Sequence, residues 1–382
     1  METSELIEII SRGEDSRIQY KANIHNNDSL AAEIVAFCNS GGGKIIVGVD
    51  DKTWNVIGLS KEDIENLNQR THSAASQSVK PPVSLISENV MHPDGLVVVI
   101  TVSDGMSKPY MDNKGQIWVK SMGDKDRVTS REEIQRMFQS AGLLHGDEIP
   151  AKGLSVSDID LPFFENFFQK EYDESTNEQE NPLQTILENM NLAKSGNLNI
   201  AGALLFAKQM RFHLPAFIVK AVAYPGIEID EDTYVDSRDI SGKISDIFQQ
   251  AISFISINIR HKQSNKSVNS TGDPVIPKIV LEELIANALI HRDYFISAPI
   301  RIFVFSNRVE LISPGHLPNN LTIQNIKSGN SNIRNPILAS FATKLLPYRG
   351  LGNGIRRALK VYPDIEFIDD HEGNLFKVII LN

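Results

Sequence analysis

The chain has 382 residues and a formal net charge of −10 at pH 7, and 41% of its residues are apolar. That length suffices for two or three domains, and the chain contains no run of about 18 apolar residues, which a membrane-spanning helix needs. The acidic N-terminus lacks the features of a signal peptide, and the single cysteine, Cys38, excludes an intramolecular disulfide and a cysteine-rich zinc site. We therefore expect a cytoplasmic protein that makes no contact with a membrane.

The hydrophobic patterns divide the chain into three ranges, all of which mix helices and strands. Residues 1–145, 146–269 and 270–382 are predicted to be an α/β domain, an α/β connector domain and a second α/β domain. The acidic excess lies in the first two ranges, and the third is nearly balanced. Since no range is strongly basic, nucleic-acid binding through bulk charge is excluded, and any such contact must use a local basic patch.

The first range alternates short helices and strands. Asp28 or Ser29 can cap a helix that ends at the glycines 41–43, and Ser130 can cap a last helix whose first turn contains Glu132 and Glu133. The predicted helices are residues 6–11, 30–39, 61–78 and 131–138, and the predicted strands are residues 15–22, 44–49, 83–88, 95–102 and 117–120.

Several motifs of this range stand in a recognisable order. They are residues 14–21 (EDSRIQYK), 36–42 (AFCNSGG), 46–51 (IVGVDD), 108–110 (KPY) and 117–120 (IWVK). Together they resemble the Schlafen-type AlbA domain, which is associated with nucleic-acid binding. Some Schlafens are endoribonucleases that cut transfer RNA with two Glu, one Asp and a nearby Lys.

The resemblance places that nuclease site on particular residues. It implies that Glu14 is the first glutamate, Asp51 (or Asp50) the aspartate and Lys21 the lysine, while the second glutamate falls on Gln19. Glu14 and Asp51 would then be ligands of Mg²⁺ or Mn²⁺, although Gln19 lacks the negative charge that helps a site to dehydrate the ion. Three alternatives stay open: an active nuclease, a module that only binds nucleic acid, and polar residues that merely end strands.

A basic patch is the candidate contact for nucleic acid. Cationic side chains interleaved with aromatic rings suit phosphate contact combined with base stacking. The alternative is a solvated charged loop with Trp118 in the core. The predicted patch consists of Lys120, Lys125, Arg127, Arg131 and Tyr110, with Trp118 nearby.

The middle range shows no catalytic constellation. Its predicted helices are residues 158–172, 183–191 and 241–259, and residues 199–207 and 216–224 read as a helix followed by a strand. Residues 261–271 read as a polar linker.

A helix at residues 281–294 carries the clearest chemistry of the third range. Glu283 and Asn287 are four residues apart, so they lie one turn from each other on one face. A carboxylate can take a proton from water, and an amide oxygen is a hard ligand for Mg²⁺. The alternative is a surface helix whose polar residues are solvated.

The segments after this helix favour the functional interpretation. Residues 299–304 and 309–312 read as a hairpin, and a stiff turn containing Gly315 follows it. The loop at 349–357, with Gly350, Gly352 and Gly354, runs into a helix start and would present backbone N–H groups to a phosphate.

This order of motifs resembles the GHKL ATPase fold of gyrase, mismatch-repair proteins and histidine kinases, and more closely the divergent GHKL-like domain known as the RecG-helicase-like C-terminus. The resemblance implies an α/β sandwich that binds ATP and Mg²⁺, with Glu283 as the general base and Asn287 as the metal ligand. Gly350, Gly352 and Gly354 would form the phosphate lid. The aspartate that reads the adenine amino group in that family falls on Ser313. Losing such a buried partner costs on the order of 1–3 kcal/mol, which weakens ATP affinity or base specificity.

The sequence therefore predicts an α/β (α+β) protein in which a nucleic-acid-binding AlbA-like domain is coupled to a GHKL-like ATP-binding domain. We expect a regulator, of the transcriptional type, that binds DNA or RNA and is homodimeric by analogy with both families. Two enzyme activities stay open, a weak ATPase and a Schlafen-like ribonuclease. One alternative is a Schlafen-like metal-dependent endoribonuclease acting in stress or phage defence. The other is a DNA-binding protein whose GHKL-like domain has lost nucleotide.

Overall fold

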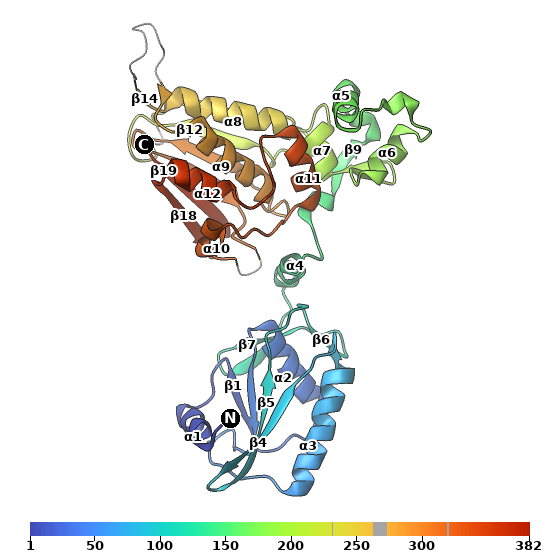
Figure 1. Cartoon of the computed structure of the whole chain (residues 1–382), viewed down its shortest axis with the longest axis vertical. Coiled ribbons are helices and arrows are strands. Elements are labelled where there is room, and N and C mark those ends of the chain that lie inside the picture. The colour runs from blue at the N-terminus through green and yellow to red at the C-terminus, as the bar shows by residue number, and fades with distance from the viewer. Residues whose placement is uncertain (231, 263–272, 319–320) are drawn as a thin grey trace. The chain divides into compact units, whose positions relative to one another are not determined.

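In a computed structural model of the chain, residues 1–230, 232–262, 273–318 and 321–382 are described. They form two compact units, Met1–Leu144 and His145–Asn382 (Figure 1). Both units mix helices and strands, which confirms the predicted α/β class. The boundary predicted at 269/270 and most of the predicted linker at 261–271 lie outside the described residues. Among the described helices, none is both long and apolar enough to cross a membrane.

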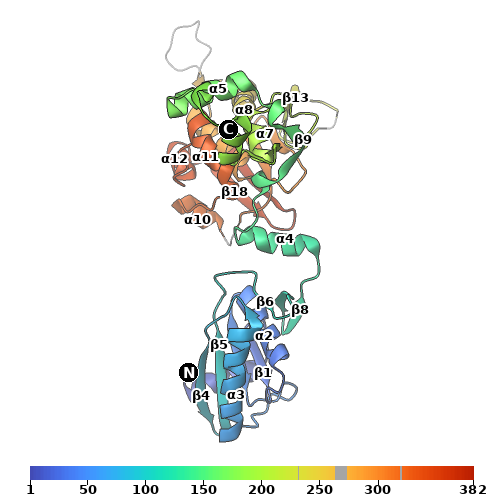
Figure 2. The ribbon, with the colours of Figure 1, turned by 90° about the vertical axis from the view of Figure 1, so that its right-hand side faces the viewer.

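The first unit is built on a four-stranded sheet with the order β1-β2-β5-β4, in which only β1 and β2 are parallel. Alternate residues of β5 are buried on opposite faces, as a strand covered on both sides requires. Helices α2 and α3 cover one face and α1 covers the other, and Figure 2 views the sheet from the α3 side. The bounds are α1 Thr3–Arg12, β1 Ile18–Lys21, α2 Asn27–Asn39, β2 Gly43–Val47, α3 Lys61–Ser73, β4 Ile86–His92 and β5 Gly95–Val102.

Helix α2 is buried almost along its whole length. Asn26 caps it by accepting hydrogen bonds from the backbone N–H groups of Asp28 and Ser29. Every residue from 30 to 38 is buried, and Glu33 is the one charged side chain among them.

Asn39, the last residue of α2, binds the backbone at Tyr110 and at Trp118. Its side-chain nitrogen donates to the carbonyl oxygens of Tyr110 and Trp118 at 3.0 and 2.9 Å, and its oxygen accepts from the Tyr110 N–H at 2.8 Å. The backbone around the Lys-Pro-Tyr motif is thereby fixed to the helix. The remaining elements of the first unit are a π-helical turn Ala74–Ser78, β3 Val79–Lys80, β6 Met111–Asp112, β7 Trp118–Ser121, β8 Asp124–Arg127 and α4 Arg131–Ser140.

The second unit contains a six-stranded sheet with the order β13-β12-β16-β17-β19-β18. Strand β12 pairs in parallel with β16, for example Val219 with Ile300, so the middle range supplies two strands to the sheet of the C-terminal range. Helices α8, α9 and α12 lie over one face of this sheet (Figure 1). The bounds are β12 Val219–Ala223, β13 Asp236–Ile240, α8 Ile244–Asn258, α9 Lys278–His291, β16 Ile300–Val304, β17 Arg308–Pro314, α12 Gly354–Val361, β18 Ile365–Asp370 and β19 Leu375–Leu381.

A smaller three-stranded sheet with the order β10-β11-β9 packs into the same core. The Phe206 ring lies 5.1 Å from the rings of Phe164 and Phe167 and 5.9 Å from that of Phe341, a residue of the C-terminal range. One hydrophobic core therefore spans the predicted connector and the predicted third domain. The remaining bounds are β9 Pro150–Ser155, α5 Leu161–Tyr172, α6 Leu183–Asn189, β10 Ala193–Lys194, β11 Asn197–Asn199, α7 Ile200–Phe206, β14 His261–Lys262, β15 Asp273–Pro274, α10 Ile323–Ser328 and α11 Pro336–Leu345, with 3-10 turns at Gly146–Glu148, Val156–Asp158 and Thr176–Glu178.

This shared core predicts that residues 145–382 unfold together. Phe206→Ala should lower the free energy of unfolding of the second unit by about 3–5 kcal/mol, because it removes a fully buried ring. Amide exchange measured by mass spectrometry should accelerate in both α7 and α11. Phe212→Ala, at a ring that is 83% exposed, is the matched control and should change little. Faster exchange in α7 alone would mean that the two ranges are separate cooperative units.

Candidate functional site

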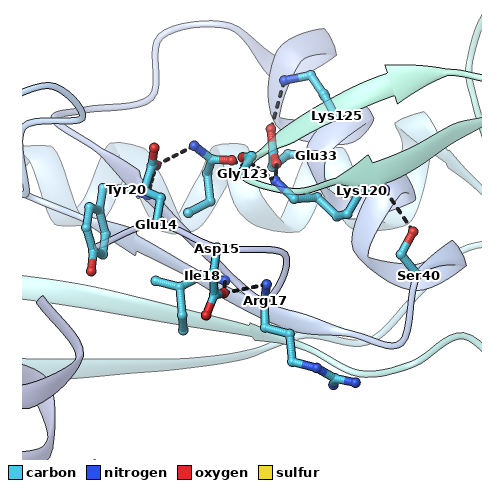
Figure 3. Close-up of polar contacts among 11 residues, drawn as sticks. Glu14, Asp15, Arg17, Ile18, Tyr20, Glu33, Ser40, Lys120, Gly123 and Lys125 are labelled. Atoms are coloured by element: carbon cyan, nitrogen blue, oxygen red, sulfur yellow. Dashed lines mark hydrogen bonds and ion pairs between the residues drawn. The ribbon is translucent and has the colours of Figure 1, made fainter. Parts of the chain in front are cut away.

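The first unit contains a cluster of polar side chains that come from four elements and meet beside α2 (Figure 3). We call it the buried polar cluster. Its members are Glu14 before β1, Gln19 on β1, Glu33 on α2, Lys120 on β7 and Lys125 on β8.

Glu14 and Gln19 join the start of β1 to this cluster. The Gln19 side-chain nitrogen donates to Glu14 Oε1, which also accepts the Tyr20 N–H at 2.6 Å. The turn between them is closed by Asp15, whose Oδ1 accepts the N–H groups of Arg17 and Ile18 at 2.7 and 2.9 Å. The local sequence thus positions the Glu14 carboxylate through backbone and side-chain donors.

Lys120 and Glu33 form a buried ion pair. The Lys120 ammonium has no exposed surface and donates to Glu33 Oε1 at 3.0 Å, to Gln19 Oε1 at 2.8 Å and to the Gly123 carbonyl oxygen at 2.9 Å. Lys125 pairs with Glu33 Oε2 at 2.8 Å. Burial opposes ionisation of Glu33, but the ammonium groups of Lys125 and Lys120 outweigh it and hold the pKa of this carboxyl below its usual value.

These contacts give a physical reason for glutamine at position 19. Its amide nitrogen donates to one carboxylate while its oxygen accepts from the Lys120 ammonium. A glutamate could not donate to Glu14 and would place a second negative charge against it, so this glutamine complements both neighbours.

The predicted nuclease residues are not all gathered in this cluster. Asp51 is exposed in the turn after β2, where Asp50 Oδ1 accepts the N–H groups of Lys52 and Thr53 at 3.0 and 2.7 Å. Lys21 lies two residues after Gln19 on β1 and is half-buried. In the part of the chain that the structure describes, no group of three potential metal ligands includes Glu14 or Asp51.

The predicted basic patch requires a correction at two residues. The Lys120 ammonium is buried and has three acceptors, so it cannot reach a phosphate. Tyr110 is 6% exposed, and its ring therefore cannot stack on a base. Trp118 is partly buried and donates its ring N–H to Asp112 Oδ2 at 3.0 Å.

The other members of the predicted patch are more accessible. Arg127 on β8 and Arg131 at the start of α4 are exposed. The Lys125 side chain is 23% exposed, although its ammonium is paired with Glu33. Arg127 and Arg131 are therefore the predicted cations that remain free to meet a phosphate.

The second unit contains a cavity of about 230 Å³. Helix α9 forms one wall, the end of β17 with the turn after it forms a second, and the loop before α12 forms a third. This volume lies just below the roughly 300–1,000 Å³ of ordinary ligand pockets. All of the predicted nucleotide residues line it: Glu283, Asn287, Gly315, Gly350, Gly352 and Gly354.

Glu283 is tied to α12 at this cavity. It is buried, and its carboxylate forms an ion pair with Arg357, one turn into α12. A Cβ atom added to Gly354 would lie 2.2 Å from Glu283 Oε2. Gly354 therefore leaves room for the Glu283 carboxylate at the start of α12, and a larger residue there would require that carboxylate to move.

Asn287 and Ser313 supply the other polar groups of the cavity wall. The Asn287 side-chain nitrogen donates to the Glu283 carbonyl oxygen at 2.7 Å, so its amide oxygen is the atom that could meet a metal ion. The Ser313 hydroxyl donates to the Ala288 carbonyl oxygen at 3.3 Å. The resemblance implies an aspartate that binds the base at position 313. The wall has instead the Ser313 hydroxyl, whose proton is already donated to Ala288.

The loop wall is fixed by glycines and by His291. Gly352 has a φ of +69°, and a Cβ atom there would lie 2.5 Å from the Gly329 carbonyl oxygen. His291 Nε2 lies 3.2 Å from the Tyr348 hydroxyl, which links α9 to the loop. Burial, together with the nearby Arg334 charge, lowers the pKa of His291 to about 4, so this ring is neutral near pH 7. Asn353 gives the start of α12 no side-chain cap, which leaves its first N–H groups for an anion.

The turn that contains Gly315 is fixed from behind by Arg334. Its guanidinium donates to the carbonyl oxygens of His291 at 3.4 Å and His316 at 2.8 Å. Gly315 has a φ of +94°, and a Cβ atom there would lie 2.5 Å from Arg334 Nη1. The glycine is thus needed to let this arginine pass behind the cavity wall.

Sequence reasoning missed Glu33, Arg334 and Arg357. Glu33 had a detectable signal, since it is a lone charge in a helix that is otherwise apolar from residue 30 to 38. Arg357 also had a detectable signal, because it follows Gly354 by three residues. Residues three apart on a helix lie on the same face, so Arg357 lies on the same face of α12 as Gly354. Arg334 had none, because its partners are carbonyl groups far away in the sequence.

Each of the two compact units contains a segment that matches a known family model. Residues 14–129 match the family model described as "Schlafen, AlbA_2", and residues 297–378 match the one described as "Putative ATP-dependent DNA helicase recG C-terminal". None of the curated proteins matches the chain. Among solved structures, the DIP2311 protein of Corynebacterium diphtheriae is similar at 18% identity and a TM-score of 0.46, over 99% of this chain and 80% of that one. The N-terminal domain of a RecG-related protein of Nitrosomonas europaea is similar at 17% identity and a TM-score of 0.27, over 34% of this chain and 96% of that one.

The buried ion pair generates a prediction for Glu33→Gln. Leaving the Lys120 ammonium buried without its countercharge should cost about 3–5 kcal/mol of unfolding free energy near pH 7. Since the folded-state pKa of Glu33 is lowered, its stabilising effect is present above the usual carboxyl value of 4.5 and is lost as pH falls through the lowered value. The unfolding free energy of the variant should therefore fall less than that of the wild type between pH 7 and pH 3, as measured by urea unfolding.

The control for this prediction is Glu65→Gln on the exposed side of α3. It should change stability by no more than about 0.5 kcal/mol. Equal stability of wild type and Glu33→Gln at pH 7 would show that the pair contributes nothing to the fold.

Proposed function

Since the chain carries a Schlafen AlbA_2 domain in its first unit and an ATPase-like domain of the RecG C-terminal type in its second, we propose that it is a nucleic-acid-binding regulator that responds to nucleotide. The first unit would bind DNA or RNA through exposed cations. The second unit would bind ATP with Mg²⁺. Nucleotide would alter nucleic-acid binding by favouring one of two arrangements of the protein, because a ligand shifts such an equilibrium only by its difference in affinity for the two states.

The cavity between α9, the end of β17 and the glycine-rich loop is the observation that carries this proposal. Its residues fit a metal-bound polyphosphate: an amide oxygen at Asn287, backbone N–H groups at the uncapped start of α12, and glycines at the loop. A bound ATP–Mg²⁺ would supply the negative charge that these groups are arranged to meet. The apolar part of the wall, which includes Leu317 and Phe376, suits the face of a base.

The state of Glu283 argues for slow turnover. The Glu283 carboxylate is occupied at Oε1 by its ion pair with Arg357, so that oxygen is not available to a water molecule. To take a proton from water, Glu283 must first separate from Arg357. Nucleotide hydrolysis would thus be slow compared with nucleotide binding, as suits a regulator that responds to bound nucleotide.

Ser313 argues for weak selection among bases. A hydroxyl that donates to Ala288 can still accept a hydrogen bond, but it lacks the charge of a carboxylate. We infer that ATP would be preferred over GTP by less than in relatives that have an aspartate at this position.

The first unit favours binding over cleavage. The Lys120 ammonium lies between Gln19 and Glu33, where it already supplies the positive charge that a metal ion would bring. With Asp51 exposed in a separate turn, we propose no metal-dependent nuclease step for this unit. A homodimer stays a prediction, which sedimentation with and without nucleotide would check.

The nucleotide proposal predicts a thermal shift. ATP–Mg²⁺ at about 100 times its Kd should stabilise the protein by about 2.7 kcal/mol, and Asn287→Ala should remove the part of that effect that depends on Mg²⁺. Asn307→Ala, an exposed asparagine of the β16–β17 hairpin, is the matched control and should keep the full shift. A wild-type protein that shows no shift at millimolar ATP would contradict nucleotide binding.

The nucleic-acid proposal predicts a change in salt dependence. Each phosphate contact on B-DNA contributes about 0.9 to the slope of log K against log salt, so Arg127→Ala with Arg131→Ala should weaken binding of all sequences and flatten that slope by about 2. Fluorescence polarisation with labelled duplex DNA and single-stranded RNA at several salt concentrations measures both effects. Arg12→Ala with Lys61→Ala removes two exposed charges elsewhere on the unit and serves as the control. An unchanged slope in the first double variant would place the contact on other residues.

A further inference from the structure

Two histidines and an aspartate of the second unit converge outside the nucleotide residues. His316 lies in the turn after β17, Asp369 lies near the end of β18, and His371 begins the turn between β18 and β19. One potential ligand atom from each residue lies within 4.8 Å of the other two. His371 is 68% exposed and Asp369 is 10% exposed at their side chains, so the group opens to solvent on one side.

The backbone of the neighbouring residue orients two of these side chains. His316 Nδ1 lies 2.8 Å from the Leu317 carbonyl oxygen, so this nitrogen carries the proton and Nε2 keeps its lone pair. The Leu317 N–H donates to Asp369 Oδ1 at 2.8 Å. Oδ2 is then the aspartate oxygen that faces His371, with His371 Nε2 at 2.9 Å.

The segments that carry these residues are themselves tied together. The Gly315 N–H donates to the Asn374 carbonyl oxygen at 2.9 Å, and the His316 N–H to the Asn374 side-chain oxygen at 3.3 Å. The Arg334 guanidinium donates to the His316 carbonyl oxygen at 2.8 Å. The turn after β17 is thus fixed against the β18–β19 hairpin, which is the support that ligand side chains need.

We propose that His316, Asp369 and His371 form a binding site for a divalent transition-metal ion of the Zn²⁺ class. In a tetrahedral zinc site, ligand bonds of about 2.0–2.2 Å separate the ligand atoms by roughly 3.3 Å. The observed 2.9 Å between aspartate and histidine, within a group no wider than 4.8 Å, needs only a small adjustment to reach that spacing. The hydrogen bond from His316 Nδ1 to a carbonyl is the usual support for a histidine that binds zinc.

An Asp369–His371 ion pair alone does not account for the arrangement. The His316 ring lies 4.3 Å from the His371 ring, at an interplanar angle of 32°. An ion pair between Asp369 and His371 uses no atom of His316, whereas a shared cation would bind one ligand atom from each of the three side chains. Imidazole nitrogens select zinc, nickel, copper or cobalt over magnesium. The site would therefore differ in metal from the magnesium that Asn287 is proposed to hold.

The site has a fourth position for a further ligand. Three protein ligands leave a tetrahedral ion one position for water or another molecule. Because His316 also lines the cavity, a metal ion here would lie at the edge of that cavity. This inference goes beyond nucleotide binding and does not depend on it.

The test uses the untagged full-length chain, stripped of metal with a chelator and titrated with Co²⁺ alone. Co²⁺ bound to histidine and carboxylate gives visible absorption bands that report tetrahedral ligation. We expect one equivalent per chain, displacement by one equivalent of Zn²⁺, and no displacement by millimolar Mg²⁺. His371→Ala should weaken Co²⁺ binding by roughly 100-fold or more, since removing one of three ligands costs at least as much as removing a supporting group.

The controls separate ligation from folding. His371 is mostly exposed, so His371→Ala should keep the wild-type circular dichroism spectrum. His261→Ala removes an exposed histidine of the same unit and should leave Co²⁺ binding unchanged. Co²⁺ binding that is absent in the wild type, equal in His371→Ala, or lost to millimolar Mg²⁺ would each overturn the proposal. None of these measurements uses nucleotide, so they stay valid if the cavity binds none.

Discussion

Glu33 is a carboxylate inside a helix that is buried on every side, and the two lysines that neutralise it come from a hairpin about ninety residues further along the chain. An unpaired charge at such a position would cost several kcal/mol, so the hairpin β7–β8 must close over α2 for the unit to fold. The closed hairpin also gives the Lys120 residue its other hydrogen-bond partners. Gln19 and the Gly123 carbonyl complete the ligands of the Lys120 ammonium, and the Ser40 hydroxyl accepts the Lys120 N–H at 2.8 Å.

A buried arginine, Arg292, fixes the end of helix α9 in the second unit. Arg292 is 2% exposed and donates to the carbonyl oxygens of Ile296 and Ala298 at 3.0 and 2.7 Å, which fixes the chain where it leaves α9. Asn335 then donates to the Ile290 and Arg292 carbonyl oxygens, each at 2.8 Å. The two bonds from Asn335 satisfy carbonyl groups at the end of α9, where no intrahelical donor exists. The helix that carries Glu283 and Asn287 is therefore held at its C-terminal end by side chains that never reach the cavity.

The local sequence pattern was sufficient to predict helices and strands, but it did not predict which distant elements pack against each other. The pattern of residues 281–294 predicted the helix α9, which begins at Lys278 and ends at His291, and the alternation after Pro299 predicted the hairpin of β16 and β17. Nothing local indicated that β12 pairs with β16 across about eighty residues, because parallel partners are chosen by packing rather than by a turn. The patch at Lys120 failed for a related reason. A lysine on a short strand is usually solvated, and its burial follows from Glu33, whose own burial is visible only once α2 lies in the core.

The two units differ in what their polar groups leave unused. In the buried polar cluster the side chains of Gln19, Glu33 and Lys120 bond to one another or to neighbouring protein groups, and Glu14 Oε1 accepts two donors, so these contacts stabilise the unit. Around the cavity, by contrast, the bonds made by Asn287 and His316 each use one nitrogen of the side chain and leave a second atom, Asn287 Oδ1 and His316 Nε2, as an acceptor. The start of α12 has backbone donors without a side-chain cap. Unused acceptors and donors thus gather around the cavity of the second unit, whereas in the first unit Arg127 and Arg131 are the exposed cations of the predicted patch.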